Sequence, residues 1–186
     1  DEGTGAVVTP IYQVSTFKQD GVGGLRGGYE YSRSANPTRA ALEECLAALE
    51  GGLRGFAFAS GLAGQDCVVR SLVGPGDHVV VPTDAYGGTY RYVNRVARVH
   101  GVEHTVASMS DPAAVRAAIE PGRTKLVWVE TPSNPLLGVA DIAALAAVAH
   151  EAGALLVVDN TFATSYLQQP LALGADIVTH STTKYA

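Results

Sequence analysis

Three short, uninterrupted apolar runs constrain the fold of this chain more than any other feature of its sequence. They span residues 79–81, 126–129 and 155–158. Runs of this length without polar alternation are typical of strands that are covered on both faces, as in parallel sheets. A more polar strand is expected at 102–106, and a last strand begins at Ile177. The sequence therefore predicts a buried, mostly parallel sheet.

Helical patterns separate these runs. Asn36-Pro37 opens one helix and Asp111-Pro112 another, because these residues favour the N-cap and the first helical position. A third helix is expected over residues 142–152. Alternation of strand and helix predicts an α/β fold with helices on both faces of the sheet. One face of the first helix carries residues at spacings of three and four: Leu42, Cys45, Leu46 and Leu49.

Composition excludes several classes of function. The net charge of -5 gives no reason to expect a nucleic acid or an anionic membrane as partner. No apolar run approaches the roughly 20 residues of a membrane span, and no signal segment opens the chain. Cys45 and Cys67 lack metal or redox spacing, so we expect buried reduced thiols and no metal site. A cytoplasmic location is the corresponding expectation.

Polar side chains follow the ends of three predicted strands, where ligands bind in an open α/β sheet. A carboxylate at one strand end and a lysine at the next fit pyridoxal phosphate (PLP). The amine of Lys184 can form a Schiff base, and Asp159 can hold the pyridine nitrogen protonated. The polar residues at these ends include Glu130, Thr131, Ser133, Asn134, Asp159, Asn160, Thr161, Thr179, Ser181, Thr183 and Lys184.

Several of these residues also allow a less specific interpretation. Taken without Lys184, Asp159 could equally be a helix N-cap. Tyr86, on a glycine-containing loop, either stacks on a flat heteroaromatic ring or merely caps the sheet. Glu130 could be a general base but fits better as a supporting partner. We reject the interpretation of Lys184 as a surface lysine, because hydroxyl groups crowd its strand end.

A phosphate site is indicated near residue 60. Residues 58–64 are interpreted as a strand end that turns into a helix, where Gly61 permits close backbone approach and free N–H groups face an anion. Alone, Ser60 would more simply be an N-cap. Together with Ser181 and Thr183, a phosphate cradle is the better interpretation.

The first 35 residues differ from the rest. Residues 21–28 contain five glycines, and no periodicity is sustained. Such a segment is either a flexible arm or a segment ordered against another subunit. Tyr31 and Arg33 follow it; an exposed pair is the default interpretation, although arginine suits phosphate. We divide the chain into an arm, residues 1–35, and a large domain, residues 36–186.

Seven segments, in order along nearly the whole chain, resemble the Cys/Met-metabolism PLP-dependent enzymes. This family includes cystathionine γ-synthase, cystathionine γ-lyase, cystathionine β-lyase and methionine γ-lyase. The resemblance implies the large domain of the aspartate aminotransferase-like fold (fold type I). The seven segments are Tyr31-Ser32-Arg33, Asn36-Pro37-Thr38-Arg39, Ser60-Gly61-Leu62, Tyr86-Gly87-Gly88-Thr89, Glu130-Thr131-Pro132-Ser133-Asn134-Pro135, Val158-Asp159-Asn160-Thr161-Phe162 and Ser181-Thr182-Thr183-Lys184-Tyr185.

The resemblance implies a role for each segment. Lys184 would be the Schiff-base lysine and the base at the substrate's Cα, and Asp159 would pair with the pyridinium nitrogen. Tyr86 would stack on the ring and assist at the leaving sulfur, and Asn134 would contact the ring hydroxyl. The other residues expected around the cofactor are Ser60, Gly61, Leu62, Thr161, Ser181 and Thr183, of which Gly61, Leu62, Ser181 and Thr183 would hold the phosphate.

The resemblance also implies an assembly. Tyr31 and Arg33 would reach the phosphate of a neighbouring subunit, so that the site requires at least a dimer, and the family commonly forms dimers of dimers. The arm, residues 1–35, would then contact the neighbouring subunit.

The implied activity is γ-elimination or γ-replacement on a sulfur amino acid, as in cystathionine γ-lyase or cystathionine γ-synthase. Methionine γ-lyase and cystathionine β-lyase are alternatives, and a non-catalytic chain of the same fold is a distant one. Gly88 stands where methionine γ-lyases often have cysteine, which favours the cystathionine enzymes. Members of the family are about twice as long, so we expect a C-terminal domain with the arginine that binds the substrate carboxylate.

Overall fold

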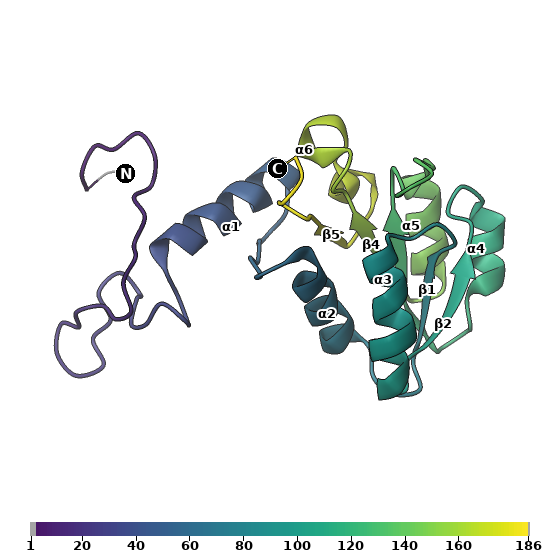
Figure 1. Cartoon of the computed structure of the whole chain (residues 1–186), viewed down its shortest axis with the longest axis horizontal. Coiled ribbons are helices and arrows are strands. Elements are labelled where there is room, and N and C mark those ends of the chain that lie inside the picture. The colour runs from purple at the N-terminus through teal and green to yellow at the C-terminus, as the bar shows by residue number, and fades with distance from the viewer. Residues whose placement is uncertain (1–2, 186) are drawn as a thin grey trace. The chain divides into compact units, whose positions relative to one another are not determined.

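The computed structural model describes residues 3–185, which form two compact units divided between Ala57 and Phe58. The second unit contains a five-stranded sheet in the order β2-β1-β3-β4-β5, with every neighbouring pair parallel (Figure 1). The predicted parallel α/β fold is therefore confirmed. The strands are β1 (His78–Pro82), β2 (Glu103–Ala107), β3 (Thr124–Glu130), β4 (Leu155–Asp159) and β5 (Ile177–Thr179).

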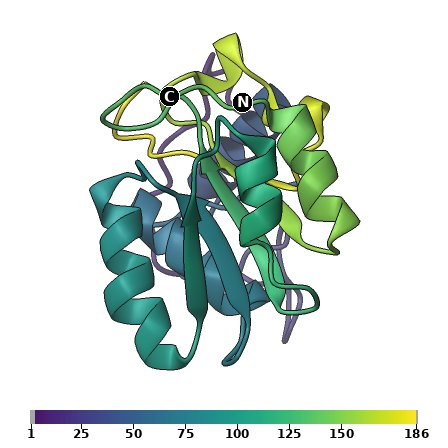
Figure 2. The same ribbon diagram turned by 90° about the vertical axis from the view of Figure 1, so that its right-hand side faces the viewer.

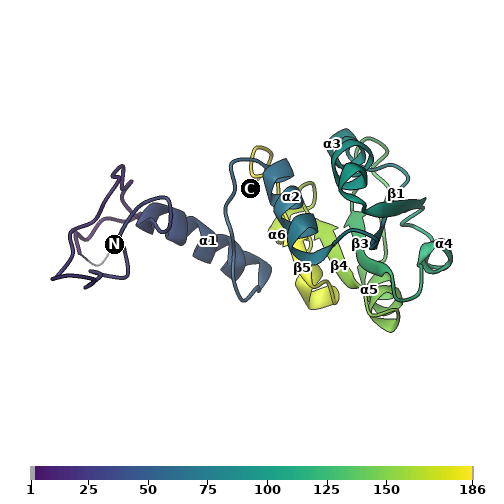
Figure 3. The same ribbon diagram turned by 90° about the horizontal axis from the view of Figure 1, so that it is seen from below.

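Helices cover both faces of this sheet (Figures 2 and 3). The helices of the second unit are α2 (Gly61–Leu72), α3 (Gly87–Tyr92), α4 (Pro112–Ala118), α5 (Ile142–Glu151) and α6 (Thr164–Leu167). A π-helical turn at Val93–Ala97 and a 3-10 turn at Arg98–His100 continue α3, and a second 3-10 turn spans Pro170–Leu173.

The apolar runs account for the two cores. Successive strand residues point to opposite faces, so Val80 and Leu156 pack in one core with α4 and α5. Val79 and Val157 pack in the other core with α2 and α3, beside the buried Trp128. Both faces are thus buried, which is why these strands lack polar alternation.

The predicted helix starts are confirmed. Asp111 accepts a hydrogen bond from the Ala113 N–H at 2.9 Å, directly before Pro112 at the start of α4. Ser60 accepts one from the Ala63 N–H at 3.1 Å at the start of α2. These caps satisfy amides that have no partner within the helix.

Within its described residues the first unit contains one helix, α1 (Pro37–Glu50), capped by Asn36, whose side chain accepts the Thr38 N–H at 2.9 Å. Gly51, at φ 70°, ends it in the left-handed conformation that glycine adopts readily. Before α1 the chain makes isolated antiparallel bridges, such as Thr16 with Tyr31, and no longer strand within residues 3–35.

The expectation that both cysteines are buried is wrong. Cys45 and Cys67 are free but exposed, because each lies on a helix side that this chain leaves uncovered. Leu42 and Leu49 on α1 are likewise about half exposed. Periodicity predicts a helix face but not what covers it.

A second expectation also fails. Residues 53–60 join no strand within residues 3–185, so the strand end predicted at Phe58 is absent, and Phe56 and Phe58 remain exposed. A strand requires a neighbouring edge for its backbone groups, and these residues find none in the described chain.

None of the helices within residues 3–185 combines the length and the apolar character that a membrane span requires.

Candidate functional site

The carboxyl ends of three neighbouring strands carry the candidate site. The parallel register places Glu130 of β3 beside Asp159 of β4, and Asp159 beside Thr179 of β5. Lys184 lies in the turn that follows β5, where its side chain is exposed, contrary to the rejection of a surface position. The strand order therefore brings the carboxylate and the lysine, which are 25 positions apart in the sequence, to the same edge of the sheet.

Asp159 is held by the residues that follow it. Its Oδ1 accepts the Thr161 hydroxyl at 2.5 Å and the Thr161 N–H at 3.0 Å. Burial raises the pKa of Asp159, and the hydrogen bonds from Thr161 oppose this, as do the charges of His180 and Lys184. A buried carboxyl of this kind is stabilised as an anion by a further cation.

The hydroxyl of Thr161 has a second partner, since its oxygen accepts the Ser181 N–H at 2.9 Å. Ser181 Oγ in turn lies 3.3 Å from the Lys184 Nζ. A Cβ added at Gly61 would lie 3.2 Å from the Ser181 Cβ. The N-terminus of α2 is thus packed against the loop after β5.

This packing presents groups that suit an anion. The first amides of α2, at Gly61 and Leu62, have no partner within the helix and carry the positive end of its dipole. Ser60 is the N-cap, so its oxygen is already an acceptor for α2, while its hydroxyl hydrogen remains a donor. Thr183 lies exposed in the turn before Lys184.

Two loops approach the same edge from β1 and β3. Glu130 is 8% exposed, and its Oε2 accepts the Tyr86 N–H at 2.7 Å while its Oε1 accepts the Asn134 N–H at 3.0 Å. Burial raises the pKa of Glu130 to about 7; the two N–H groups lower this pKa, and the charges of Asp159 and Asp84 raise it. The side chain of Tyr86 is exposed.

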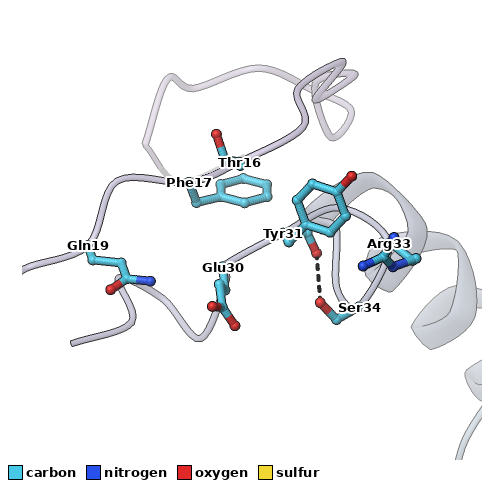
Figure 4. Close-up of a pocket in the computed structure, with 7 residues that line it drawn as sticks. All are labelled: Thr16, Phe17, Gln19, Glu30, Tyr31, Arg33 and Ser34. Atoms are coloured by element: carbon cyan, nitrogen blue, oxygen red, sulfur yellow. Dashed lines mark hydrogen bonds between the residues drawn. The ribbon is translucent and has the colours of Figure 1, made fainter. Parts of the chain in front are cut away.

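Tyr31 and Arg33 belong to the first unit. They line an open hollow of about 480 Å³ with Phe17 and Glu30, and the Arg33 Cζ lies 4.8 Å from the centre of the Tyr31 ring (Figure 4). Within residues 3–185, no carboxylate forms an ion pair with Arg33. The guanidinium charge is therefore available to an anion.

Sequence reasoning missed one connection between the loops. The Ser133 hydroxyl donates to the Asp84 carboxylate and accepts the Gly138 N–H at 2.8 Å. Asp84 follows β1 just as the other polar residues follow their strands, so the sequence could have indicated it as a site residue. The two hydrogen bonds that the Glu130 carboxylate accepts could not have been predicted in this way, because they depend on the conformation of both loops.

The residues present fit PLP. A raised pKa at Asp159 leaves a carboxyl that a ring N–H⁺ would stabilise as the anion. The Thr179 Oγ1 is buried and has no hydrogen-bond partner within residues 3–185, which suits a site that lacks its ligand's polar atoms. Free helix amides and adjacent hydroxyl groups suit a phosphate.

Comparison with known proteins agrees with this geometry. A profile of the family described as "Cys/Met metabolism PLP-dependent enzyme" matches residues 1–186. Cystathionine gamma-synthase of Mycobacterium tuberculosis is 59% identical over 185 residues, covering 100% of this chain and 47% of that protein. Cystathionine beta-lyase of Lactococcus lactis subsp. cremoris is 55% identical, over 100% of this chain and 48% of that protein.

The crystal structure of metB from Corynebacterium glutamicum superposes with a TM-score of 0.96 at 54% identity, covering 100% of this chain and 48% of that one. The chain thus spans about half the length of the relatives that it matches.

Proposed function

Because this chain belongs to the Cys/Met-metabolism PLP-dependent enzymes, we propose that it contributes the cofactor site of an enzyme that performs γ-replacement or γ-elimination on a sulfur amino acid. The observation that carries the proposal is the adjacency of β4 and β5, which brings Asp159 and Lys184 to one edge of the sheet. The fold-type I assignment agrees with the match to a family structure at TM-score 0.96.

The proposed cofactor is pyridoxal phosphate, which when bound supplies an electron sink for the charge that develops at the substrate's Cα. Lys184 would hold it covalently, and Asp159 would face its ring nitrogen. Gly61, Leu62 and Ser181 would hold its phosphate. The remaining residues proposed around the cofactor are Tyr31, Arg33, Ser60, Tyr86, Asn134, Thr161 and Thr183.

Two side chains of this chain would move protons. The Lys184 amine, held near the Ser181 Oγ at 3.3 Å, would take a proton from the substrate's Cα, and its flexible side chain can reach Cβ as well. The exposed Tyr86 hydroxyl would give a proton to the leaving sulfur. Asp159 would remain an anion throughout, because a carboxylate opposite the ring nitrogen stabilises positive charge there.

Cystathionine γ-synthase and cystathionine γ-lyase are the proposed activities. The relative named cystathionine gamma-synthase, which is 59% identical, supports the synthase. Gly88 argues against methionine γ-lyase. A Cβ at this position would lie 2.3 Å from the Tyr86 Cε1, so a cysteine there would displace the ring. The β-lyase at 55% identity keeps β-elimination as the second candidate.

The proposal includes an assembly and a location. We propose a homo-oligomer in which an arm, residues 1–35, contacts the neighbouring subunit, and residues 36–186 form the PLP-binding domain. Arg33 forms no ion pair in the part of the chain that the structure describes, which supports this assembly because a phosphate would supply one. We also propose a cytoplasmic location, with which the free Cys45 and Cys67 agree.

A product assay of the full-length protein tests the activity. O-acylated homoserine with cysteine, cystathionine alone, and methionine are supplied in separate reactions. Cystathionine formed in the first reaction identifies the synthase, and cysteine with 2-oxobutanoate from the second identifies the γ-lyase. Homocysteine with pyruvate from the second identifies the β-lyase instead. No product in any reaction would refute the proposal.

A further inference from the structure

Glu130 is a buried carboxyl group that the mechanism above does not use. Its side chain is 8% exposed, and within residues 3–185 no lysine, arginine or histidine forms an ion pair with it. The neighbouring Asp159 and Asp84 are both acidic, so they disfavour its charged form. Burial of a carboxylate without a cation is costly unless other donors compensate. The donors near Glu130 therefore indicate what it does.

Both donors are backbone N–H groups, and they belong to different loops. Tyr86 ends the loop after β1 and donates to Oε2 at 2.7 Å, and Asn134 lies in the loop after β3 and donates to Oε1 at 3.0 Å. One carboxyl group thus connects the two loops at fixed spacing. Hydrogen bonds to an ionised carboxylate are stronger than those to a neutral carboxyl group, so the two N–H groups oppose the rise in the pKa of Glu130 that burial causes.

The fixed amide of Tyr86 also constrains its ring. Tyr86 directly precedes α3, and its ring lies against Gly88 so closely that an added Cβ would meet the ring at 2.3 Å. Glu130 thus holds the backbone of Tyr86, and the absence of a side chain at Gly88 leaves room for one side of the ring. Asn134 is held in the same way through its own N–H.

We propose that Glu130 is a positioning residue whose two carboxyl oxygens hold the loops of Tyr86 and Asn134 at the spacing that the cofactor requires. This rests on the proposed function for the identity of the cofactor. Glu130 does not act as a proton-transferring base, because each of its oxygens already accepts a backbone N–H and the side chain is buried. Its effect passes through Tyr86 and Asn134.

Amide hydrogen exchange in the full-length apoprotein tests this directly. Glu130→Gln keeps the size of the side chain but has only one oxygen that can accept a hydrogen bond. Its NH₂ group would face the backbone N–H of either Tyr86 or Asn134, so one of the two hydrogen bonds is lost. We expect exchange at Tyr86 or Asn134 to rise about tenfold, and at both in Glu130→Ala. Glu151→Gln, an exposed carboxylate on α5 paired with Arg116, is the matched control and leaves these amides unchanged.

A second readout follows the cofactor. We expect the dissociation constant of PLP to rise about tenfold in Glu130→Gln and the visible circular dichroism of the bound cofactor to change. Wild-type exchange at both amides in the two Glu130 variants would overturn the proposal. So would equal acceleration at Val80 and Val127 in the central strands, since that result would mean general destabilisation. If the wild type binds no PLP, the proposed function fails, while the exchange result still decides the role of Glu130.

Discussion

The hydroxyl group of Thr161 donates a hydrogen bond to Asp159 Oδ1 at 2.5 Å, and the Thr161 N–H donates to the same oxygen at 3.0 Å. The hydroxyl oxygen also accepts the Ser181 N–H at 2.9 Å. Thr161 therefore joins the carboxylate at the end of β4 to the loop that carries Lys184. A threonine predicted only to lie near the cofactor thus connects the two ends of the proposed site.

Thr161→Val should lower kcat/KM by about ten- to a hundredfold, because Asp159 loses a donor that favours its anion. Burial already raises the pKa of Asp159, and the loss of the hydroxyl would raise it further. Steady-state kinetics of the full-length protein measure the loss. Thr161→Ser keeps the hydroxyl and should stay near wild type; equal activity of the valine and serine variants would contradict this role.

Asp159→Asn should leave PLP bound but slow turnover by about a thousandfold or more, because a neutral amide cannot stabilise a positively charged ring nitrogen. Cofactor content is read from the visible spectrum and kcat from product formation. A variant that binds PLP more weakly but keeps the wild-type kcat would show that Asp159 only retains the cofactor.

Arg33 tests whether two subunits share the site. Arg33→Ala and Lys184→Ala should each be nearly inactive alone, since one lacks the proposed phosphate cation and the other the lysine. Mixed under conditions that exchange subunits, they should regain activity, because one site of a hybrid dimer combines Lys184 of one chain with Arg33 of the other. Labelled subunits verify exchange. If verified hybrids stay inactive, Arg33 acts within its own chain.

His78 makes stability depend on pH at the opposite edge of the sheet. Its Nδ1 lies 2.9 Å from Thr124 Oγ1 and its Nε2 3.0 Å from Thr105 Oγ1. Burial lowers the pKa of His78 from 6.5, while the charge of Glu120 opposes this. The unfolded chain then binds the proton more readily, so the stability from neutral His78 is present above pH 6.5 and is lost as pH falls below it.

Urea unfolding at about pH 7 and about pH 5 measures this effect. The wild type should lose more stability between these values than His78→Gln, which cannot titrate. The difference in unfolding free energy between the two proteins at each pH cancels the contributions that they share. These include the contributions of His104 and Glu130, whose pKa values are also shifted. Parallel pH profiles of the two proteins would contradict the assignment.

The parallel sheet could be predicted from the sequence, and so could the meeting of polar residues at the carboxyl ends of its strands. Uninterrupted apolar runs require burial on both faces, and parallel strands bring their carboxyl ends to one edge, so Asp159 and Lys184 could be expected at the same edge. Their adjacency depends on the strand order, which places β4 beside β5. Caps such as Asp111 were equally accessible, because capping is a local interaction.

Other features depend on partners that no local pattern reveals. The exposure of Cys45, Cys67 and Phe58 reflects helix faces and backbone edges that this chain does not cover. The two hydrogen bonds of Glu130 depend on how the loops after β1 and β3 fold back over the sheet. Sequence spacing gives the type of an element, whereas these contacts are set by tertiary structure.

Borohydride reduction of the full-length protein, followed by peptide mass spectrometry, tests the central claim most directly. The lysines of this chain are Lys18, Lys125 and Lys184. Lys125 lies near Asp77 at the amino end of β3, away from the proposed site, so it serves as an internal control. The proposal predicts the mass of the reduced cofactor on Lys184 alone among the three, and its loss with the yellow colour in Lys184→Ala, which should still fold. A full-length protein that carries no such adduct, or that carries it on another lysine, would contradict the claim.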